Sequence, residues 1–246
     1  MMQLKDKIAV VTGGNSGIGY ATANELKNQG AKVIITGRRK EAVSQAADEL
    51  GVDWIVADQG NVSDIENLVS EIKRKFGKVD ILFINAGVLG GSAIAEATEE
   101  IFDQVINVNF KGAYFTLSRF IPILNDGASV VFLSSNTASM NAANSSIYSS
   151  SKAALNSVMK IAAVELAPRH IRVNAVSPGP IETPILSKQG YDQATLDGIK
   201  DWIIERVPLK HIGKAEDVAK LVAHLSQPES SFITGSEFLI DGGMSL

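Results

Sequence analysis

The sequence predicts an α/β protein built on a Rossmann-type, doubly wound parallel sheet of about seven strands, with helices on both faces. Short apolar runs rich in β-branched residues alternate with longer amphipathic segments along the 246 residues, which is the pattern of repeated βαβ units. A glycine-rich stretch, TGGNSGIG at residues 12–19, follows the first apolar run. No repeat, low-complexity tract or linker divides the chain, so we expect one domain over residues 1–246.

Seven apolar runs are assigned to the strands of this sheet, and helical patterns fill the intervals between them. In chain order the predicted strands are Ile8–Val11, Lys32–Thr36, Trp54–Val56, Ile81–Ile84, Ser129–Leu133, Arg172–Val176 and Glu237–Ile240.

Two helices carry recognisable boundaries. The first is expected to begin near Ile18 and to end near Gly30, because glycine is a natural C-cap residue. Ser63 and Glu66 have the spacing of a capping box, which predicts the start of a helix that closes near Gly77.

The region from Pro178 to Pro208 is the least regular part of the chain. Pro178, Pro180 and Pro184 stand at its start, and a helical pattern covers Ala194–Arg206. We expect a substrate-loop insertion at about 178–208 that acts as a lid, because long irregular connections in compact domains are often functional. The alternative is an ordinary surface excursion.

Composition excludes several classes of function. With 23 basic and 27 acidic side chains and a net charge of −4, the chain lacks the cationic field that nucleic acid or an anionic membrane requires. It has no cysteine, which removes disulfides, thiolate nucleophiles and cysteine-ligated metals. The N-terminus has no signal-like apolar segment and no later stretch is long enough to span a bilayer, so we expect a soluble, cytoplasmic protein without a metal.

The glycine-rich loop predicts a dinucleotide site. Glycine lets a pyrophosphate approach the backbone, and the following helix offers free N–H groups and the positive end of its dipole. The lysine and hydroxyl residue of a nucleoside-triphosphate loop are absent, which disfavours phosphoryl transfer. The loop residues expected at the cofactor are Gly13, Asn15, Ser16, Gly17, Ile18 and Gly19.

The end of the second strand favours NADP(H) over NAD(H). Gly37 stands where an NAD-binding fold usually presents an acid to the ribose hydroxyls, and Arg38 and Arg39 follow. Arginine can hold a 2′-phosphate through charge-assisted hydrogen bonds. The alternative for both arginines is a solvated basic start to the next helix.

Tyr148 and Lys152 are four residues apart in IYSSSKAAL, so a helix would place them on one face. A charge pair near 4 Å is worth at most about 4 kcal/mol at moderate dielectric. We therefore expect the Lys152 ammonium to lower the pKa of the Tyr148 phenol toward neutral pH. The alternative is a half-buried aromatic ring beside a solvated lysine.

Taken in order, these motifs resemble those of the short-chain dehydrogenase/reductase family over essentially the whole chain. TGGNSGIG is similar to the family's T-G-x-x-x-G-x-G loop, Asn85–Gly87 to its N-A-G segment, and Val108–Phe110 to the segment carrying its catalytic asparagine. Ser135, thirteen positions before Tyr148, matches the catalytic serine, and SPGPIET at residues 177–183 matches the loop that braces the nicotinamide.

The resemblance implies roles for four catalytic residues. Tyr148 would exchange a proton with the substrate oxygen, and Ser135 would hydrogen-bond to that oxygen. Lys152 would bind the nicotinamide ribose and lower the tyrosine pKa, while Asn109 would hold a water that relays protons toward Lys152. Taken singly, Asn109 and Ser135 could also be capping or strand-end residues.

The resemblance also implies further cofactor contacts. Thr183 and the Ile181 backbone would fix the carboxamide, and Asn85 would lie along the cofactor. The family often has aspartate before the valine that meets the adenine, whereas this chain has Asn61 before Val62; the Asn61 amide oxygen can accept the same hydrogen bond without charge. The remaining residues expected at the cofactor are Ala86, Gly87, Pro178 and Gly179, together with Tyr148 and Lys152.

The expected function is oxidation or reduction of a ketone or secondary alcohol, with a small molecule as substrate. Two alternatives stay open: a 3-oxoacyl carrier-protein reductase, and a non-catalytic dinucleotide-binding regulator, which would not need a tyrosine acid beside a lysine. An acidic carrier protein would need a basic docking patch, to which Lys111, Arg119, Arg169 and Arg172 are candidates.

The family further implies a homotetramer or homodimer built on the helices that hold Asn109 and Tyr148 and on the last strand. The histidines, His170, His211 and His224, form no ligand pair and are expected at the surface or at caps. The residues expected to line the substrate side are Val88, Leu89, Asn136, Thr137, Asn141, Asn144, Ile185 and Leu186.

Overall fold

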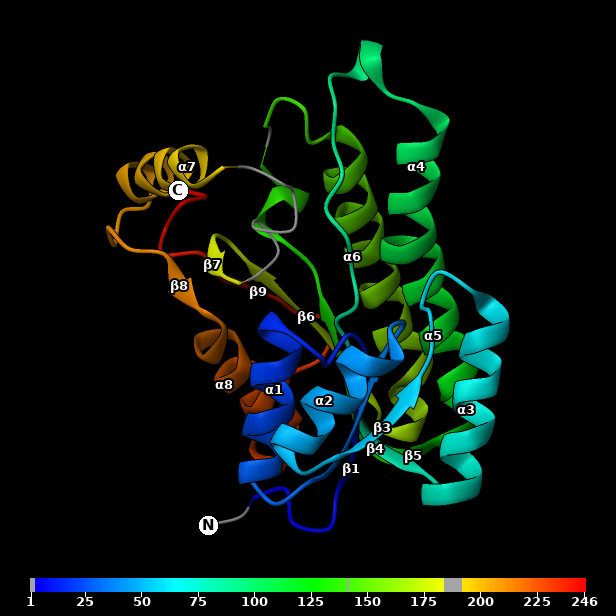
Figure 1. The fold of residues 1–246 in the computed structure, drawn as a ribbon. Coiled ribbons are helices and arrows are strands. Elements are labelled where there is room, and N and C mark those ends of the chain that lie inside the picture. The colour runs from blue at the N-terminus through cyan, green and yellow to red at the C-terminus, as the bar shows by residue number, and fades with distance from the viewer. Residues whose placement is uncertain (1–2, 141, 184–191) are drawn as a thin grey trace.

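The computed structural model describes residues 3–140, 142–183 and 192–246. Seven parallel strands form its main sheet in the order β3-β2-β1-β4-β5-β6-β9, which confirms the predicted Rossmann-type architecture (Figure 1). The strands are β1 (Ile8–Val11), β2 (Lys32–Gly37), β3 (Asp53–Val56), β4 (Val79–Ile84), β5 (Leu124–Leu133), β6 (Arg172–Pro178) and β9 (Glu237–Ile240).

Eight α-helices connect or flank these strands in the described residues. They are α1 (Gly17–Asn28), α2 (Lys40–Leu50), α3 (Val62–Phe76), α4 (Glu99–Ile106), α5 (Ala113–Phe120), α6 (Ser146–Leu166), α7 (Gln193–Arg206) and α8 (Ala215–Ser226). A π-helical turn, η2 (Asn107–Gly112), joins α4 to α5, and short 3₁₀ turns include η4 (Asn136–Ala138).

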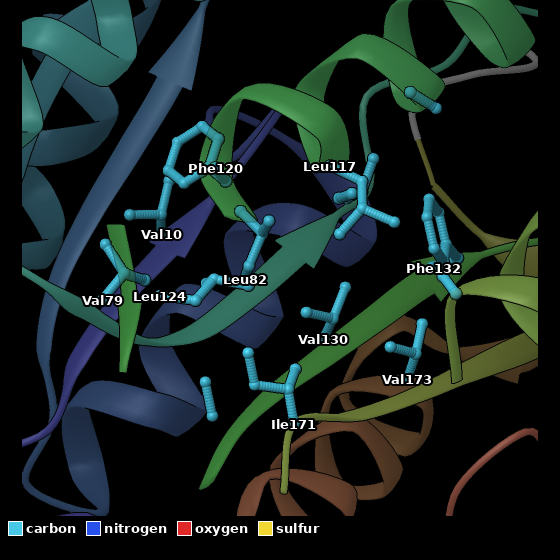
Figure 2. Close-up of a cluster of buried hydrophobic side chains, with 14 of the residues drawn as sticks. Val10, Val79, Leu82, Leu117, Phe120, Leu124, Val130, Phe132, Ile171 and Val173 are labelled. Carbon is cyan, nitrogen blue, oxygen red and sulfur yellow. The ribbon is translucent and has the colours of Figure 1, made fainter. Parts of the chain in front are cut away.

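The two faces of the sheet bury separate apolar clusters, because successive side chains of a strand point to opposite faces. Val10 of β1 belongs to the cluster covered by α3, α5 and α6, which Figure 2 shows around Leu82, Leu117 and Phe120. Its neighbours Ala9 and Val11 belong to the cluster covered by α1, α2 and α8. Helices therefore cover both faces of the sheet (Figure 1), which leaves the ends of the strands accessible for a site.

The predicted end of the first helix is close to the observed one. Helix α1 ends at Asn28, and Gly30 follows with φ of 96°. The N–H of Gly30 donates to the Lys27 carbonyl and the N–H of Ala31 to the Leu26 carbonyl, which is the hydrogen-bond pattern of a Schellman motif.

The predicted capping box at Ser63 and Glu66 is wrong. Helix α3 begins at Val62, and its N-cap is Asn61, whose Oδ1 accepts a hydrogen bond from the Ser63 N–H at 2.9 Å. Asparagine is as good an N-cap as serine, so the residue two positions earlier takes the role. The predicted end of the helix is correct, since Phe76 is its last residue and Gly77 its C-cap.

The segment after β6 departs from the main sheet. Ile181–Glu182 (β7) pairs in parallel with Gly213–Lys214 (β8) to form a separate two-stranded sheet, which the sequence did not predict. Helix α7 lies between these strands in the chain and agrees with the helical pattern predicted for Ala194–Arg206. In the ranges that the structure describes, no helix has both the length and the apolar character needed to cross a membrane.

Candidate active site

Two of the predicted cofactor segments meet at the carboxyl ends of β1 and β4. Strand β1 lies between β2 and β4, so the chain leaves it in one direction through β2 and β3 and returns on its other side through β4 and β5. In such a sheet the crevice for a ligand opens where the strand order reverses. The glycine loop follows β1 and the Asn85–Gly87 segment follows β4, so both border this crevice.

A buried hydrogen-bond network joins these two segments. The Thr12 hydroxyl oxygen accepts hydrogen bonds from the N–H groups of Asn85 at 2.9 Å and Ala86 at 3.0 Å. In return the Asn85 amide donates to the carbonyls of Thr12 at 2.8 Å and Gly13 at 3.2 Å. The Asn85 side chain, which we expected along the cofactor, is thus committed to bracing the glycine loop, and its contact with cofactor stays a prediction for the backbone.

The loop accepts only glycine at two points. Gly13 has φ of +65°, and a Cβ atom on Gly19 would lie 2.4 Å from the Gly13 carbonyl oxygen. Helix α1 starts at Gly17, within this glycine-rich stretch. The chain therefore offers bare backbone and a helix N-terminus at the carboxyl edge of the sheet, which fits the pyrophosphate of a dinucleotide.

At the end of β2 the Asn15 side chain lies close to Gly37. A Cβ atom on Gly37 would lie 2.7 Å from Oδ1 of Asn15, so the Asn15 amide stands over the position at which an NAD-binding fold usually has a carboxylate. Arg38 and Arg39 follow with exposed side chains, and Arg39 is the N-cap residue of α2 without a side-chain capping bond.

Asn61 and Val62, which were expected to contact the adenine, lie at the start of α3. Asn61 is the N-cap of this helix and Val62 is its first residue, and their contact with the adenine stays a prediction. Asp58 comes two residues after β3 and is partly buried, and the Ala57 N–H before it bonds to the Gly37 carbonyl at 3.1 Å. Asp58 is therefore a further candidate at the cofactor end of β3, beside Asn61. Its place directly after an apolar run was the available signal, since ligands bind beyond the carboxyl ends of the strands.

Gln59 is a second residue that the sequence analysis missed. Its side chain is 7% exposed, and its Nε2 donates to the carbonyls of Ala86 at 2.8 Å and Val108 at 3.1 Å. Its Oε1 is buried without a hydrogen-bond partner. Gln59 thus ties the segment after β4 to the π-helical turn that carries Asn109, at the cost of one unsatisfied acceptor.

Asn109 lies in that π-helical turn, a type of irregularity that occurs frequently at functional sites. It is 1% exposed. Its Oδ1 accepts from the Val88 N–H at 2.8 Å and its Nδ2 donates to the Val88 carbonyl at 2.9 Å. The side chain therefore fixes the Val88 backbone, and the expected water relay through Asn109 stays a prediction.

Three further residues form the predicted catalytic group. Helix α6 carries Tyr148 and Lys152 one turn apart, and Ser135 ends the connection from β5 as the N-cap of η4. The Lys152 ammonium lies 5.7 Å from the centre of the Tyr148 ring and donates a hydrogen bond to the Leu133 carbonyl at 2.8 Å. The structure thus brings the residues together and directs the ammonium toward the end of β5.

The electrostatics differ from the sequence-based expectation. Burial raises the pKa of Tyr148 above its ordinary value, and the hydrogen bond with Ser135 acts in the opposite direction. Burial also lowers the pKa of Lys152 to about 8. We expected Lys152 to lower the Tyr148 pKa, but its ammonium is bound to Leu133, and desolvation of the phenol dominates.

The predicted nicotinamide loop lies against the last strand. The Gly179 N–H donates to the Ile240 carbonyl at 3.0 Å, and a Cβ atom on Gly179 would lie 2.5 Å from Cβ of Asp241. Pro178 ends β6, Ile181 begins β7, and Thr183 is partly exposed. These residues occupy the carboxyl edge of β6 beside β9, as the expected role requires.

The substrate side agrees in part with the prediction. Val88, Leu89 and Thr137 are partly exposed and Asn144 is exposed, whereas Asn136 is buried and its amide faces Asp241 at 3.5 Å. Asn141, Ile185 and Leu186 lie outside the described residues. A cavity of about 490 Å³ opens beside η4 and α6, and its lining includes Thr137, Met140, Ser145, Ser149 and Ala153.

His170, His211 and His224 are exposed, as predicted.

Comparison with known proteins is consistent with this geometry. Residues 13–245 match the family model described as enoyl-(acyl carrier protein) reductase. A 3-oxoacyl-[acyl-carrier-protein] reductase of Thermotoga maritima is 35% identical, with 99% of each chain covered. An NADP-dependent (R)-specific alcohol dehydrogenase of Lentilactobacillus kefiri is 32% identical over 98% of this chain and 97% of its own.

Solved structures show the same fold over nearly the full length. A short-chain dehydrogenase/reductase of Brucella melitensis superposes with a TM-score of 0.92 at 32% identity, covering 98% of each chain. A short-chain dehydrogenase of Burkholderia cenocepacia in complex with NADP gives a TM-score of 0.90 at 33% identity, covering 99% of this chain and all of its own.

Proposed function

The chain belongs to the short-chain dehydrogenase/reductase family, and we propose that it is an NADP(H)-dependent oxidoreductase of ketones and secondary alcohols with Tyr148 as general acid and base. The observation that carries this proposal is the placement of Ser135, Tyr148 and Lys152 around one point at the carboxyl end of β5. We further propose that the chain acts as one Rossmann-type domain with the substrate-loop insertion predicted at about 178–208, of which residues 184–191 lie outside the described residues.

The reaction in the reducing direction follows from the protonation states of these side chains. A bound reduced nicotinamide would supply the hydride, which no side chain can provide. Because the Tyr148 pKa is raised, the phenol holds its proton at neutral pH and gives it to the carbonyl oxygen. Because the Lys152 pKa is about 8, its ammonium is charged at pH 7, and we propose that it binds the nicotinamide ribose.

The charges before α2 support NADP(H). Arg38, Arg39 and Lys40 place three cations at the N-terminus of that helix, with Glu41 as the acid in its first turn. Cations there oppose the positive end of the helix dipole, so a phosphate bound between them removes an unfavourable interaction and gains charge-assisted hydrogen bonds. Two similar proteins carry NADP in their descriptions, which is consistent with this choice.

A small ketone or alcohol is favoured over a carrier-protein substrate. Of the four candidate docking cations, Arg119 is paired with Glu66 at 2.9 Å, Arg169 is paired with Asp126 at 2.8 Å, and Arg172 is 9% exposed. Lys111 is exposed, but a single lysine makes no docking patch. The similarity to a carrier-protein reductase keeps 3-oxoacyl thioesters on the list of compounds to test.

The proposed assembly rests on the family resemblance, and the proposed compartment rests on the absence of cysteine from the chain. We propose a homotetramer or homodimer that uses the helices around Asn109 and Tyr148 and the edge strand β9, in the cytoplasm. Size-exclusion chromatography with light scattering would measure the subunit number directly.

The first experiment follows NADPH oxidation with ketones, aldehydes, and 3-oxoacyl and enoyl thioesters, using Tyr148→Phe as the control. The variant keeps the ring and loses only the transferable proton, so we expect turnover to fall by about 10²–10⁴-fold while NADPH binding is kept. Retained turnover would refute the role of Tyr148. Tight coenzyme binding without turnover of any compound by the wild-type protein would favour the regulator alternative.

The coenzyme assignment is tested with Arg38→Asp. The new carboxylate repels a 2′-phosphate and can accept hydrogen bonds from free ribose hydroxyls. We expect the dissociation constant of NADPH to rise by at least about tenfold, in keeping with loss of one charged hydrogen bond, while that of NADH changes little. Lys220→Asp, at an exposed position of α8 away from these cations, is the matched control. Equal losses for both coenzymes in Arg38→Asp would contradict the assignment.

A further inference from the structure

The hydroxyl oxygen of Ser135 accepts two hydrogen bonds, both from Thr137. Its Oγ accepts a hydrogen bond from the Thr137 N–H at 3.3 Å, and the Thr137 hydroxyl donates to the same atom at 3.0 Å. Ser135 is 7% exposed, and Thr137 is partly buried. The two residues belong to the tight 3₁₀ turn η4, for which Ser135 is the N-cap, so the turn itself brings them together.

Counting protons and lone pairs fixes the direction of these bonds. A serine hydroxyl has one proton and two acceptor sites. The Thr137 N–H can only donate, so it takes one acceptor site. When Ser135 gives its proton to the Tyr148 oxygen, which is the direction that lowers the phenol pKa, the Thr137 hydroxyl must donate into the second site. Both acceptor sites of Ser135 are then filled, and it can act only as a donor.

Without the Thr137 hydroxyl this direction would no longer be enforced. Ser135 would regain an acceptor site, and the Tyr148 O–H could donate into it. The phenol proton would then point at Ser135 rather than at the substrate oxygen, and the proton transfer would start from a misdirected hydrogen bond.

We propose that Thr137 is a positioning residue of the active centre, whose hydroxyl and N–H occupy the acceptor sites of Ser135 and so direct the serine proton toward the Tyr148 oxygen. This inference rests on the proposed function, since it assigns Thr137 a role only through Ser135. Thr137 also lines the cavity of about 490 Å³ beside η4, so a direct contact with substrate is the competing role that the experiment must separate.

The test compares Thr137→Val with Thr137→Ser. Valine keeps the shape and the backbone N–H but removes the hydroxyl, whereas serine keeps the hydroxyl and removes only a methyl group. We expect kcat of Thr137→Val to fall about tenfold, the equivalent of one hydrogen bond, with KM little changed and the loss similar for large and small substrates. Thr137→Ser should stay within about twofold of the wild-type kcat.

Two further readouts separate positioning from a general structural role. In alcohol oxidation the rising limb of the pH profile should move to higher pH in Thr137→Val, because the phenolate loses a fixed donor, and should stay in place in Thr137→Ser. In a Ser135→Ala background, adding Thr137→Val should cause no further loss, because the group through which Thr137 acts is gone.

The outcomes distinguish the inference from the proposed function. A Ser135→Ala variant as active as the wild type would refute the proposed role of Ser135 itself. Given a large loss in Ser135→Ala, the positioning role is overturned by any of three results: Thr137→Val with wild-type kcat, Thr137→Ser as impaired as Thr137→Val, or losses that multiply in the double variant. A change confined to KM and dependent on substrate size would assign Thr137 to direct substrate contact instead.

Discussion

Helix α1, behind the glycine loop, buries Gly19, Ala21, Thr22, Ala23 and Leu26, whereas α7, in the segment after β6, buries none of its residues. Helix α1 lies beside α8 and α2, whereas α7 lies apart from them (Figure 1). The first packs against α8 and lies over the sheet, while the second exposes even Trp202, which stacks on its neighbour Arg206 with 3.9 Å between the guanidinium carbon and the ring centre.

This difference in burial separates the part of the molecule that would bind the coenzyme from the part that would choose the substrate. The dinucleotide side is part of the core, and its loop is fixed by buried bonds such as those between Thr12 and Asn85. The α7 side contributes little to the core, so its sequence can change at low cost in stability. We therefore expect coenzyme binding to be sensitive to single atoms and substrate choice to be set by the more tolerant segment.

The largest expected effect on stability comes from Gly19→Ala in α1. The new Cβ would lie 2.4 Å from the Gly13 carbonyl oxygen and 2.5 Å from the Asn85 amide nitrogen, so the loop must move. We expect a loss of about 1–3 kcal/mol in the free energy of unfolding and a fall in kcat/KM on the order of 100-fold. Urea denaturation and steady-state kinetics measure these effects. Normal values for both would show that the loop is less tightly packed than its contacts indicate.

A second prediction concerns Lys152, a buried residue of α6. A folded-state pKa of about 8 instead of 10.5 corresponds to about 3 kcal/mol of unfavourable free energy for the buried ammonium. That cost is fully present below pH 8, is relieved as pH rises from about 8 to 10.5, and is gone above. Lys152→Met also loses the bond to Leu133, so we expect a net gain in stability of about 1–2 kcal/mol at pH 7 together with loss of turnover.

The stability of Lys152→Met should be compared with that of the wild type at pH 7 and pH 10, by urea denaturation. The advantage of the variant should shrink or reverse at the higher pH, because the wild-type lysine is then neutral in the fold. A variant that is less stable than the wild type at pH 7 would show that the ammonium stabilises the protein, contrary to the lowered pKa.

The smallest effect is expected from Gly198→Ala in α7, which is the matched control for Gly19→Ala. A Cβ on Gly198 meets nothing within 4 Å, and alanine is favoured over glycine inside a helix by up to about 1 kcal/mol. We expect unchanged NADPH affinity and equal or slightly higher thermal stability. A loss of coenzyme affinity in this variant would contradict the proposal that coenzyme binding depends on α1 and its loop and not on α7.

The sequence alone determined the regular part of the fold. The predicted limits of β1 and β9 agree with the structure, and those of β2 and β3 differ by one residue. These strands are read from a local pattern of apolar, β-branched residues, which depends on no distant partner. Strand β5 was predicted from Ser129 but begins at Leu124, because Asn125–Gly127 resembles a turn and Gly127 has φ of 81° within the strand.

Most candidate site residues, though not Asp58 and Gln59, were available from the motifs and the family that they resemble, but their contacts were not. Asn85 meets Thr12, Gln59 meets Val108, and Lys152 meets Leu133 across 19 to 73 positions of sequence. Such pairs depend on how strands and helices cross, which a local pattern does not contain. The raised pKa of Tyr148 has the same origin, since sequence gives the distance along a helix whereas only the tertiary structure decides how deeply a group is buried and toward which atom a charge turns.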